Sequence, residues 1–386
     1  MMHNMQHAAR RLFLTLAILA LSLSGLSYPA QAANGQAGLD KSGSPWDFLF
    51  PFSAIRREPA VTVVPGGQSI GIQLRAEGIL VVGYHLIRRG RDAVSPGEQA
   101  NLRAGDVIVA VDGRRVCSVG QVAKLIEAAG KSGKALAVLY RRRGIAVRTL
   151  LRPVFDDETG AYRIGLFIRD SASGVGTLTF YMPGSRVFGA LGHVIADMDT
   201  GEPIDGSGQI VRAAVTSIDR GESGQPGEIR GQFLDEARTL GRIEHNNSFG
   251  VFGHMAAPPD HGLICRPVPV AAPEDVHVGS ADLLTVVSGQ RVQRFAAVIV
   301  RVNRQSEADI KGFIVRVTDP ALLSRTGGIV QGMSGSPILQ DGKLVGAVTH
   351  VFVSDPTQGY GVYAAWMVQC ALQGGAGAGL RMPRAG

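Results

Sequence analysis

The fold of this chain is constrained most by a regular succession of short strand patterns. Apolar stretches with β-branched residues recur along the sequence and are separated by glycine-containing turns. The 386 residues include 51 glycines, and few stretches show a long helical periodicity. Regular short strands divided by turns are typical of a β-sandwich or a β-barrel. We therefore expect a mainly β protein, with strands at residues 174–181, 188–197, 213–218, 241–243, 283–287, 295–302 and 312–317.

A second pattern precedes most of these strands. Residues 63–74 read as a glycine loop leading into a strand, 78–84 as a strand and 119–129 as a short helix. Between them, residues 96–113 read Pro-Gly-Glu-Gln-Ala-Asn-Leu-Arg-Ala-Gly-Asp-Val-Ile-Val-Ala-Val-Asp-Gly, and this segment resembles part of a PDZ domain. Such domains add an extended peptide to a sheet edge and hold its carboxylate with loop amides. The resemblance implies a PDZ domain at residues 61–153. Its peptide-binding loop would be Ser69, Ile70, Gly71 and Ile72; the alternative is a unit that packs on its neighbour and binds no peptide.

The N-terminus has the pattern of an export signal. Arg10 and Arg11 precede an apolar run from Leu12 to Leu26, and Ala30-Gln31-Ala32 follows as a cleavage pattern. We expect residues 1–33 to be a signal peptide, with a retained N-terminal anchor as the alternative. Either would place the folded part outside the cytoplasm. Residues 34–60 are expected to be a flexible linker and residues 374–386 a disordered tail.

One loop has the composition of a nucleophile site. Residues 332–337 read Gly-Met-Ser-Gly-Ser-Pro. Gly332 and Gly335 lack a Cβ, so they can adopt positive φ and let a substrate carbonyl approach. In serine-type acyl transfer, the amides of the serine and of the residue two positions earlier stabilise the oxyanion. The sequence therefore predicts Ser334 as nucleophile and the amides of Gly332 and Ser334 as an oxyanion hole, with an ordinary glycine-rich loop as the alternative.

A serine nucleophile needs a base, and histidine is the best general base near neutral pH. His193 ends an apolar, strand-like run bracketed by glycines, which favours it, and His254 is the next candidate. His350 lies on a strand, where alternation predicts a core or surface position and no reactive role. Asp319 is one candidate for the acid that orients the base, although it could instead cap the turn before Pro320. Its rivals are Asp197, Asp199 and Asp219.

Charge and cysteine content exclude several other classes. The net charge is +7, with the basic excess in the first half, but the basic runs lack the interleaved aromatic residues of nucleic-acid binders. We therefore expect no nucleic-acid partner. Cys117, Cys265 and Cys370 are widely spaced and form no metal-binding motif. No metal site and no cofactor are predicted.

Several segments together resemble the stage IV sporulation protein B peptidases of endospore-forming bacteria. They are the N-terminal signal, the PDZ-like unit, Gly174-x-Gly-Thr-Leu-Thr-Phe180, Ala190-Leu-Gly-His193, residues 318–338 around the serine loop, and Gly346-Ala-Val-Thr-His-Val-Phe352. The resemblance implies a serine endopeptidase with a PDZ domain followed by a chymotrypsin-like double β-barrel at residues 165–373.

The family resemblance also implies roles for single residues. His193 would be the base, Ser334 the nucleophile, Asp319 the acid and Thr349 a supporting residue. One departure from the chymotrypsin pattern concerns the acid, because Asp319 lies only 15 residues before Ser334. Asp319 could therefore hold the nucleophile loop or contact substrate instead.

The biological role that the resemblance implies is sporulation signalling in the space between forespore and mother cell. The enzyme would cleave its own N-terminal segment and a membrane-bound regulator, which would release an intramembrane protease that activates sigma-K. The alternative is a non-catalytic PDZ adaptor that docks a membrane protein partner.

Overall fold

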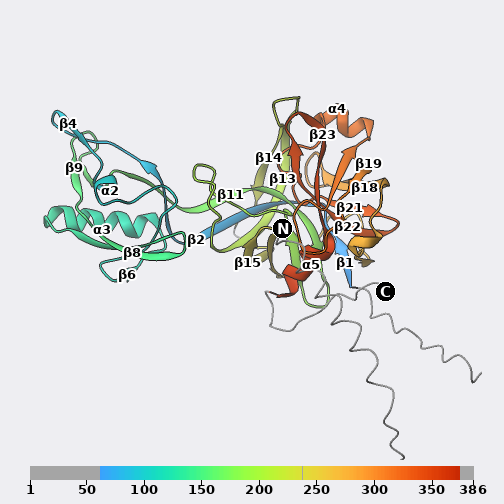
Figure 1. Ribbon diagram of the computed structural model, residues 1–386, viewed down its shortest axis with the longest axis horizontal. Coiled ribbons are helices and arrows are strands. Elements are labelled where there is room, and N and C mark those ends of the chain that lie inside the picture. Colours follow the sequence, from blue (N-terminus) through green and yellow to red (C-terminus); the bar gives the residue numbers. More distant parts are fainter. Residues whose placement is uncertain (1–60, 237, 374–386) are drawn as a thin grey trace, which may run out of the picture. The chain divides into compact units, whose positions relative to one another are not determined.

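The computed structural model describes residues 61–236 and 238–373 and is mainly β, as the sequence predicted (Figure 1). The signal peptide, linker and tail expected at residues 1–33, 34–60 and 374–386 lie outside these residues. Within the described part of the chain, no helix has the length and apolar character needed to cross a bilayer. The helices are α2 (Pro96–Gln99), α3 (Val119–Lys131), α4 (Pro320–Thr326) and α5 (Ala364–Gln373), with a 3-10 turn η1 (Pro273–Asp275).

The strands fall into three groups along the sequence. The first is β1 (Thr62–Pro65), β2 (Ser69–Tyr84), β3 (Ile87–Arg89), β4 (Asp92–Val94), β5 (Val107–Val111), β6 (Arg114–Arg115), β7 (Leu136–Arg142), β8 (Ile145–Leu151), β9 (Val154–Asp156) and β10 (Ala161–Arg163). The second is β11 (Leu166–Tyr181), β12 (Val187–Ala190), β13 (Gly206–Asp219), β14 (Glu228–Leu234), β15 (Gly241–Asn247), β16 (Gly250–Met255) and β17 (Val268–Pro269). The third is β18 (Gly279–Val286), β19 (Val292–Val302), β20 (Phe313–Val317), β21 (Pro337–Gln340), β22 (Lys343–Phe352) and β23 (Asp355–Tyr363).

Two strand rings make up the larger part of the fold. In the first, the antiparallel pairings run β11–β12–β16–β15–β13–β2 and return to β11. In the second, β18–β19–β20–β23–β22–β21 form a closed barrel. Within each ring, every strand has a neighbour on both sides over part of its length. The double β-barrel expected from the resemblance is confirmed.

The apolar core of the second barrel extends to one side of the first barrel, which also has a buried cluster of its own. One buried cluster contains Phe180 and Phe252 from the first ring together with Phe313 and Leu344 from the second. Each fully buried side chain of this size stabilises the fold by roughly 1.5–3 kcal/mol. This shared cluster packs the two barrels against each other.

A smaller unit is inserted into the first barrel. It spans residues 77–165 and contains the end of β2, β3 to β10, α2 and α3, with its own buried cluster around Ile79, Leu102, Ile126 and Tyr140. Helix α3 begins at Ser118, whose side chain accepts the Gln121 N–H. We call residues 77–165 the inserted unit.

The insertion changes the domain boundaries expected from the sequence. Residues 69–76 of β2 pair with β11 on one side and with β13 on the other, so they belong to the first barrel and not to a separate domain at 61–153. The prediction of a peptide-binding loop at Ser69, Ile70, Gly71 and Ile72 is therefore wrong. Both edges of this stretch are paired, and Ile70 and Ile72 are buried in the barrel core, so no edge is left for a peptide.

Candidate active site

The serine loop has the backbone conformation that its glycines predicted. Gly332 has φ of 94° and Gly335 has φ of 92°, in the region that favours glycine. At Gly335 a Cβ would lie 2.3 Å from the Thr177 carbonyl oxygen and 2.4 Å from the Leu191 nitrogen. The turn thus lets the loop approach the first barrel more closely than any other residue type would allow.

Strand β11 of the first barrel fixes this loop. The Thr177 N–H donates to the Ser334 carbonyl at 3.1 Å, and the Thr177 hydroxyl donates to the Gly332 carbonyl at 2.9 Å. The Thr179 hydroxyl donates to the Gly335 carbonyl at 2.8 Å. Both threonines are buried, so these bonds are shielded from water. The two threonines of the Gly-Thr-Leu-Thr sequence at residues 176–179 thus hold the nucleophile loop of the other barrel.

The two serines of the loop differ in access. Ser334 is partly exposed, and its hydroxyl donates to the Thr349 carbonyl at 2.9 Å. Ser336 is fully buried, and its hydroxyl has no hydrogen-bond partner among the described residues. Only Ser334 is accessible to a substrate, which agrees with the prediction that it is the nucleophile. Its hydrogen bond to Thr349 must break before the hydroxyl can transfer its proton to a base.

The amides expected to form the oxyanion hole are free within the described structure. No backbone acceptor in residues 61–236 and 238–373 pairs with the N–H of Gly332 or of Ser334, whereas the Gly335 N–H donates to the Val348 carbonyl at 2.8 Å. Unpaired amides in a partly exposed loop can donate to an oxyanion, and the oxyanion hole at Gly332 and Ser334 stays a prediction.

His193 lies beside β22, whose Thr349 carbonyl accepts the Ser334 hydroxyl. A Cβ on its neighbour Gly192 would lie 3.1 Å from Thr349 Cγ2, and the His193 ring centroid is 5.2 Å from that of His350. The His193 Nδ1 is 2.8 Å from the Val194 carbonyl oxygen. A carbonyl only accepts, so Nδ1 carries the proton and Nε2 keeps its lone pair. This is the tautomer that a general base requires.

The electrostatics of His193 favour its neutral form. Burial lowers its pKa below the usual value near 6.5, and the bond to the Val194 carbonyl opposes that shift only in part. A neutral imidazole near pH 7 is ready to accept a proton. His254, the other candidate base, instead contacts Glu244 at 3.0 Å from an exposed position on β16.

The carboxylate predicted to orient His193 is committed elsewhere. Asp319 is the N-cap of α4, where it accepts the N–H groups of Ala321 at 2.9 Å and Leu322 at 3.2 Å. Its second oxygen accepts the Ala296 N–H at 3.2 Å. These contacts show Asp319 in the capping role that was considered for it at Pro320. Its role as the acid stays a prediction, and no contact with His193 supports it.

The rival carboxylates do not fill the position either. Asp197 accepts bonds from the Thr200 and Asp199 amides and from Arg169 at 3.0 Å. Asp199 pairs with the same Arg169 at 2.7 Å, and Asp219 pairs with Arg230. Among the described residues, no carboxylate hydrogen bonds to His193.

Two residues at the site have contacts that place them in supporting positions. Thr349 is buried, its carbonyl accepts the Ser334 hydroxyl and its own hydroxyl donates to the Tyr360 carbonyl at 3.2 Å. This is consistent with the supporting role expected for it. Asn246 was not singled out from the sequence. Its side chain accepts the Ile195 N–H at 2.8 Å and donates to the carbonyls of Ile195 at 2.8 Å and Ile204 at 2.9 Å. These bonds fix the segment that follows His193.

Comparisons with known proteins decide which family these residues belong to. The family described as SpoIVB peptidase S55 matches residues 160–368, which is more than half of the chain, and a PDZ domain family matches residues 90–139. The chain belongs to the SpoIVB peptidase S55 family. As a member of this family with a PDZ domain, it is a serine endopeptidase, and it acts on or binds other proteins. A search of curated proteins gives no match.

Solved structures with partial likeness include a protease and a PDZ domain. The active form of the Rv3671c protease from M. tuberculosis is 17% identical with a TM-score of 0.30, covering 55% of this chain and 78% of that one. The PDZ domain of the SdrC-like protein from Listeria monocytogenes is 21% identical with a TM-score of 0.20, covering 24% and 87%. The HtrA-type protease AlgW with a decapeptide is 10% identical with a TM-score of 0.28, covering 54% of each chain. The family assignment depends on the family match alone.

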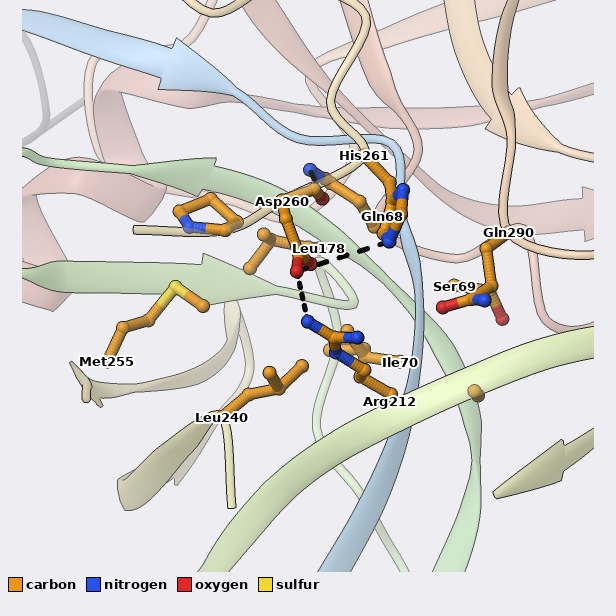
Figure 2. A pocket seen from close by; sticks show the side chains of 12 residues that line it. Gln68, Ser69, Ile70, Leu178, Arg212, Leu240, Met255, Asp260, His261 and Gln290 are labelled. Carbon is orange, nitrogen blue, oxygen red and sulfur yellow. Dashed lines mark hydrogen bonds and ion pairs between the residues drawn. The ribbon is translucent and has the colours of Figure 1, made fainter. Parts of the chain in front are cut away.

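A separate small pocket lies in the first barrel (Figure 2). There Arg212 pairs with Asp260, and the Gln68 amide donates to the Asp260 carbonyl at 3.1 Å. No residue of the predicted triad lines it. These contacts tie the loop containing Asp260 to the start of β2 and are structural.

Proposed function

We propose that this peptidase cleaves its own N-terminal segment and a membrane-bound regulator during sporulation, and that cleavage of the regulator releases an intramembrane protease that activates sigma-K. One observation carries the proposal. An accessible serine hydroxyl and two amides without a backbone partner belong to one loop of a SpoIVB peptidase, and a histidine in the base tautomer lies beside the strand whose Thr349 carbonyl accepts that hydroxyl. That the substrate is a membrane-bound regulator of an intramembrane protease is inferred from the family resemblance.

The reaction begins when the Ser334 hydroxyl leaves the Thr349 carbonyl, to which it donates at rest. As Oγ bonds to the substrate carbonyl carbon, Nε2 of His193 takes its proton. Negative charge develops on the carbonyl oxygen, and the amides of Gly332 and Ser334 donate to it. His193 then protonates the leaving amine, and water hydrolyses the acyl-enzyme with the same base.

The PDZ domain would supply the docking of a protein substrate or partner. From Leu166 to Gly176, β11 pairs with β2 and with no other strand of the described residues, so its second edge is open. Helix α3 contacts β11. An extended peptide can add to such an edge through main-chain hydrogen bonds. We propose this edge in place of the loop at residues 69–72.

Self-cleavage tests the catalytic part of the proposal. The full chain is purified as wild type, Ser334→Ala and Ser336→Ala and followed by gel and N-terminal sequencing. We expect the wild type to acquire a new N-terminus within residues 34–60 and Ser334→Ala to stay intact. Ser336→Ala is the matched control, because its unpaired hydroxyl can be removed without losing a hydrogen bond. Processing of Ser334→Ala at the wild-type rate would refute the proposal.

The regulator is tested separately by co-expressing the enzyme with a membrane-bound regulator and a sigma-K reporter. Cleavage and reporter activity are expected with the wild type and not with Ser334→Ala. If the protein cleaves itself but has no effect on the regulator, the peptidase activity stands and the signalling role is rejected.

We also propose that the folded part lies outside the cytoplasm, between forespore and mother cell. The apolar run from Leu12 to Leu26 and the Ala30-Gln31-Ala32 pattern support export. In vegetative cells that express the protein, protease added outside the cytoplasmic membrane should digest it. Mass spectrometry of the mature chain distinguishes a cleaved signal from a retained anchor, and protection from external protease would reject export.

A further inference from the structure

The active site contains a second histidine that the mechanism above does not use. The ring centroid of His350 is 5.2 Å from that of His193, and the planes are tilted by 42°. His350 directly follows Thr349, whose carbonyl accepts the Ser334 hydroxyl. His350 lies outside the buried core and is only partly covered by its neighbours, so packing in the core does not explain its position.

A β-bulge directs this side chain toward the base. Val348 pairs with Gly361 and Val351 with Gly359, so the register of β22 shifts between them. Thr349 and His350 therefore oppose the single residue Tyr360. Such a bulge breaks the alternation of a strand and re-aims side chains, often beside active sites.

The His193 ring makes one hydrogen bond among the described residues. Its Nδ1 contacts the Val194 carbonyl, and no carboxylate among the described residues bonds to it. This single bond to the next residue fixes the tautomer, and the His350 ring is the one aromatic contact of the His193 ring among the described residues. In a serine peptidase, the imidazole must be held with Nε2 toward the nucleophile.

We propose that His350 is a positioning residue for the general base, and that its ring contact with His193 supplies the orientation that a carboxylate supplies in other serine peptidases. The proposal rests on Ser334 and His193 being the nucleophile and the base. Partial burial, together with His193 and Lys311, lowers the pKa of His350, so its ring stays neutral beside the base.

The test measures how fast a fluorophosphonate probe labels the full-length protein. In that reaction Ser334 Oγ bonds to phosphorus, fluoride leaves and His193 takes the hydroxyl proton. His350→Ala removes the ring, and we expect labelling to slow by roughly 10- to 100-fold, as for a slightly misplaced catalytic group. His350→Phe keeps a ring that cannot titrate, and we expect it to restore the rate to within about 3-fold of wild type.

Two further variants keep the test informative. His350→Gln offers a second non-aromatic side chain and should be as slow as His350→Ala. His277→Gln is the matched control, since His277 is an exposed histidine paired with Asp341 through its ring at 2.9 Å and should label at the wild-type rate. Melting temperatures of all variants verify that they are folded.

Wild-type labelling by His350→Ala would overturn the proposal, and so would an equal loss in His350→Ala and His350→Phe, because a ring contact could not then be the cause. Ser334→Ala and His193→Ala are measured alongside. Labelling of Ser334→Ala would reject the nucleophile itself, an outcome distinct from failure of the role of His350.

Discussion

Asp319 offers the sharpest test of how this site works, because a helix cap and a catalytic acid respond differently to Asp319→Asn. Asparagine caps a helix about as well as aspartate. The bonds from Ala321 and Leu322 to one side-chain oxygen would therefore remain, and only the bond from Ala296 would be lost. We expect a loss of about 1 kcal/mol in the free energy of unfolding.

Asp319→Ala removes all three of these bonds, so we expect a loss of about 2 kcal/mol, the sum of a cap and one further hydrogen bond. Denaturant unfolding measures both values. For a cap, fluorophosphonate labelling of folded Asp319→Asn should stay within about 3-fold of wild type. For a catalytic acid, the same substitution costs on the order of 10⁴-fold.

The outcome that would refute our assignment is therefore specific. If Asp319→Asn melts near the wild-type temperature but labels about 10⁴-fold more slowly, Asp319 is the acid and the site must rearrange before it acts. Asp219→Asn serves as the control, since Asp219 pairs with Arg230 on the surface. It should leave both labelling and stability close to wild type.

Three further outcomes follow from the site. Asn246→Ala leaves the backbone groups it holds around Ile195 unpaired, so we expect a loss of about 2–4 kcal/mol in unfolding free energy, measured by denaturant, and slower labelling. Gly335→Ala should abolish labelling because its Cβ would overlap the first barrel, whereas Gly342→Ala, with positive φ but open space, should lose only about 1 kcal/mol and keep its labelling rate. Because burial lowers the pKa of His193, labelling should persist on acidification until below about pH 6.5, and a midpoint above that value would contradict the neutral base.

The nucleophile loop was the part of the site that could be predicted best. Positive φ at Gly332 and Gly335 is a local property that glycine spacing reveals. Asp319 shows the limit of the same reasoning. Its place before Pro320 is a local signal for a cap, and the contacts agree with that signal. Its role as the acid was one of several candidates from the sequence, and the family resemblance singled it out.

Other features depend on contacts between distant residues, which a single sequence does not reveal. His350 was expected to follow strand alternation, but the register shift in β22 turns it toward His193. Asn246 has no motif, and its role appears only when β15 lies beside the segment after His193. Residues 63–74 were predicted as a glycine loop leading into a strand, and a strand does begin at Ser69, but its partners come from residues more than 90 positions later.

The insertion of the smaller unit has a consequence for the order in which the protein folds. The β2 segment that belongs to the first barrel leaves the ribosome early, yet its partner in β11 follows only after the whole inserted unit, and its partner in β13 later still. Contacts of such long sequence separation form slowly. Early folding of the inserted unit would bring the two strands together and shorten the effective loop between them. A nascent chain would thus complete the inserted unit before the first barrel closes, and the second barrel, whose strands β21 to β23 follow the serine loop, would form last.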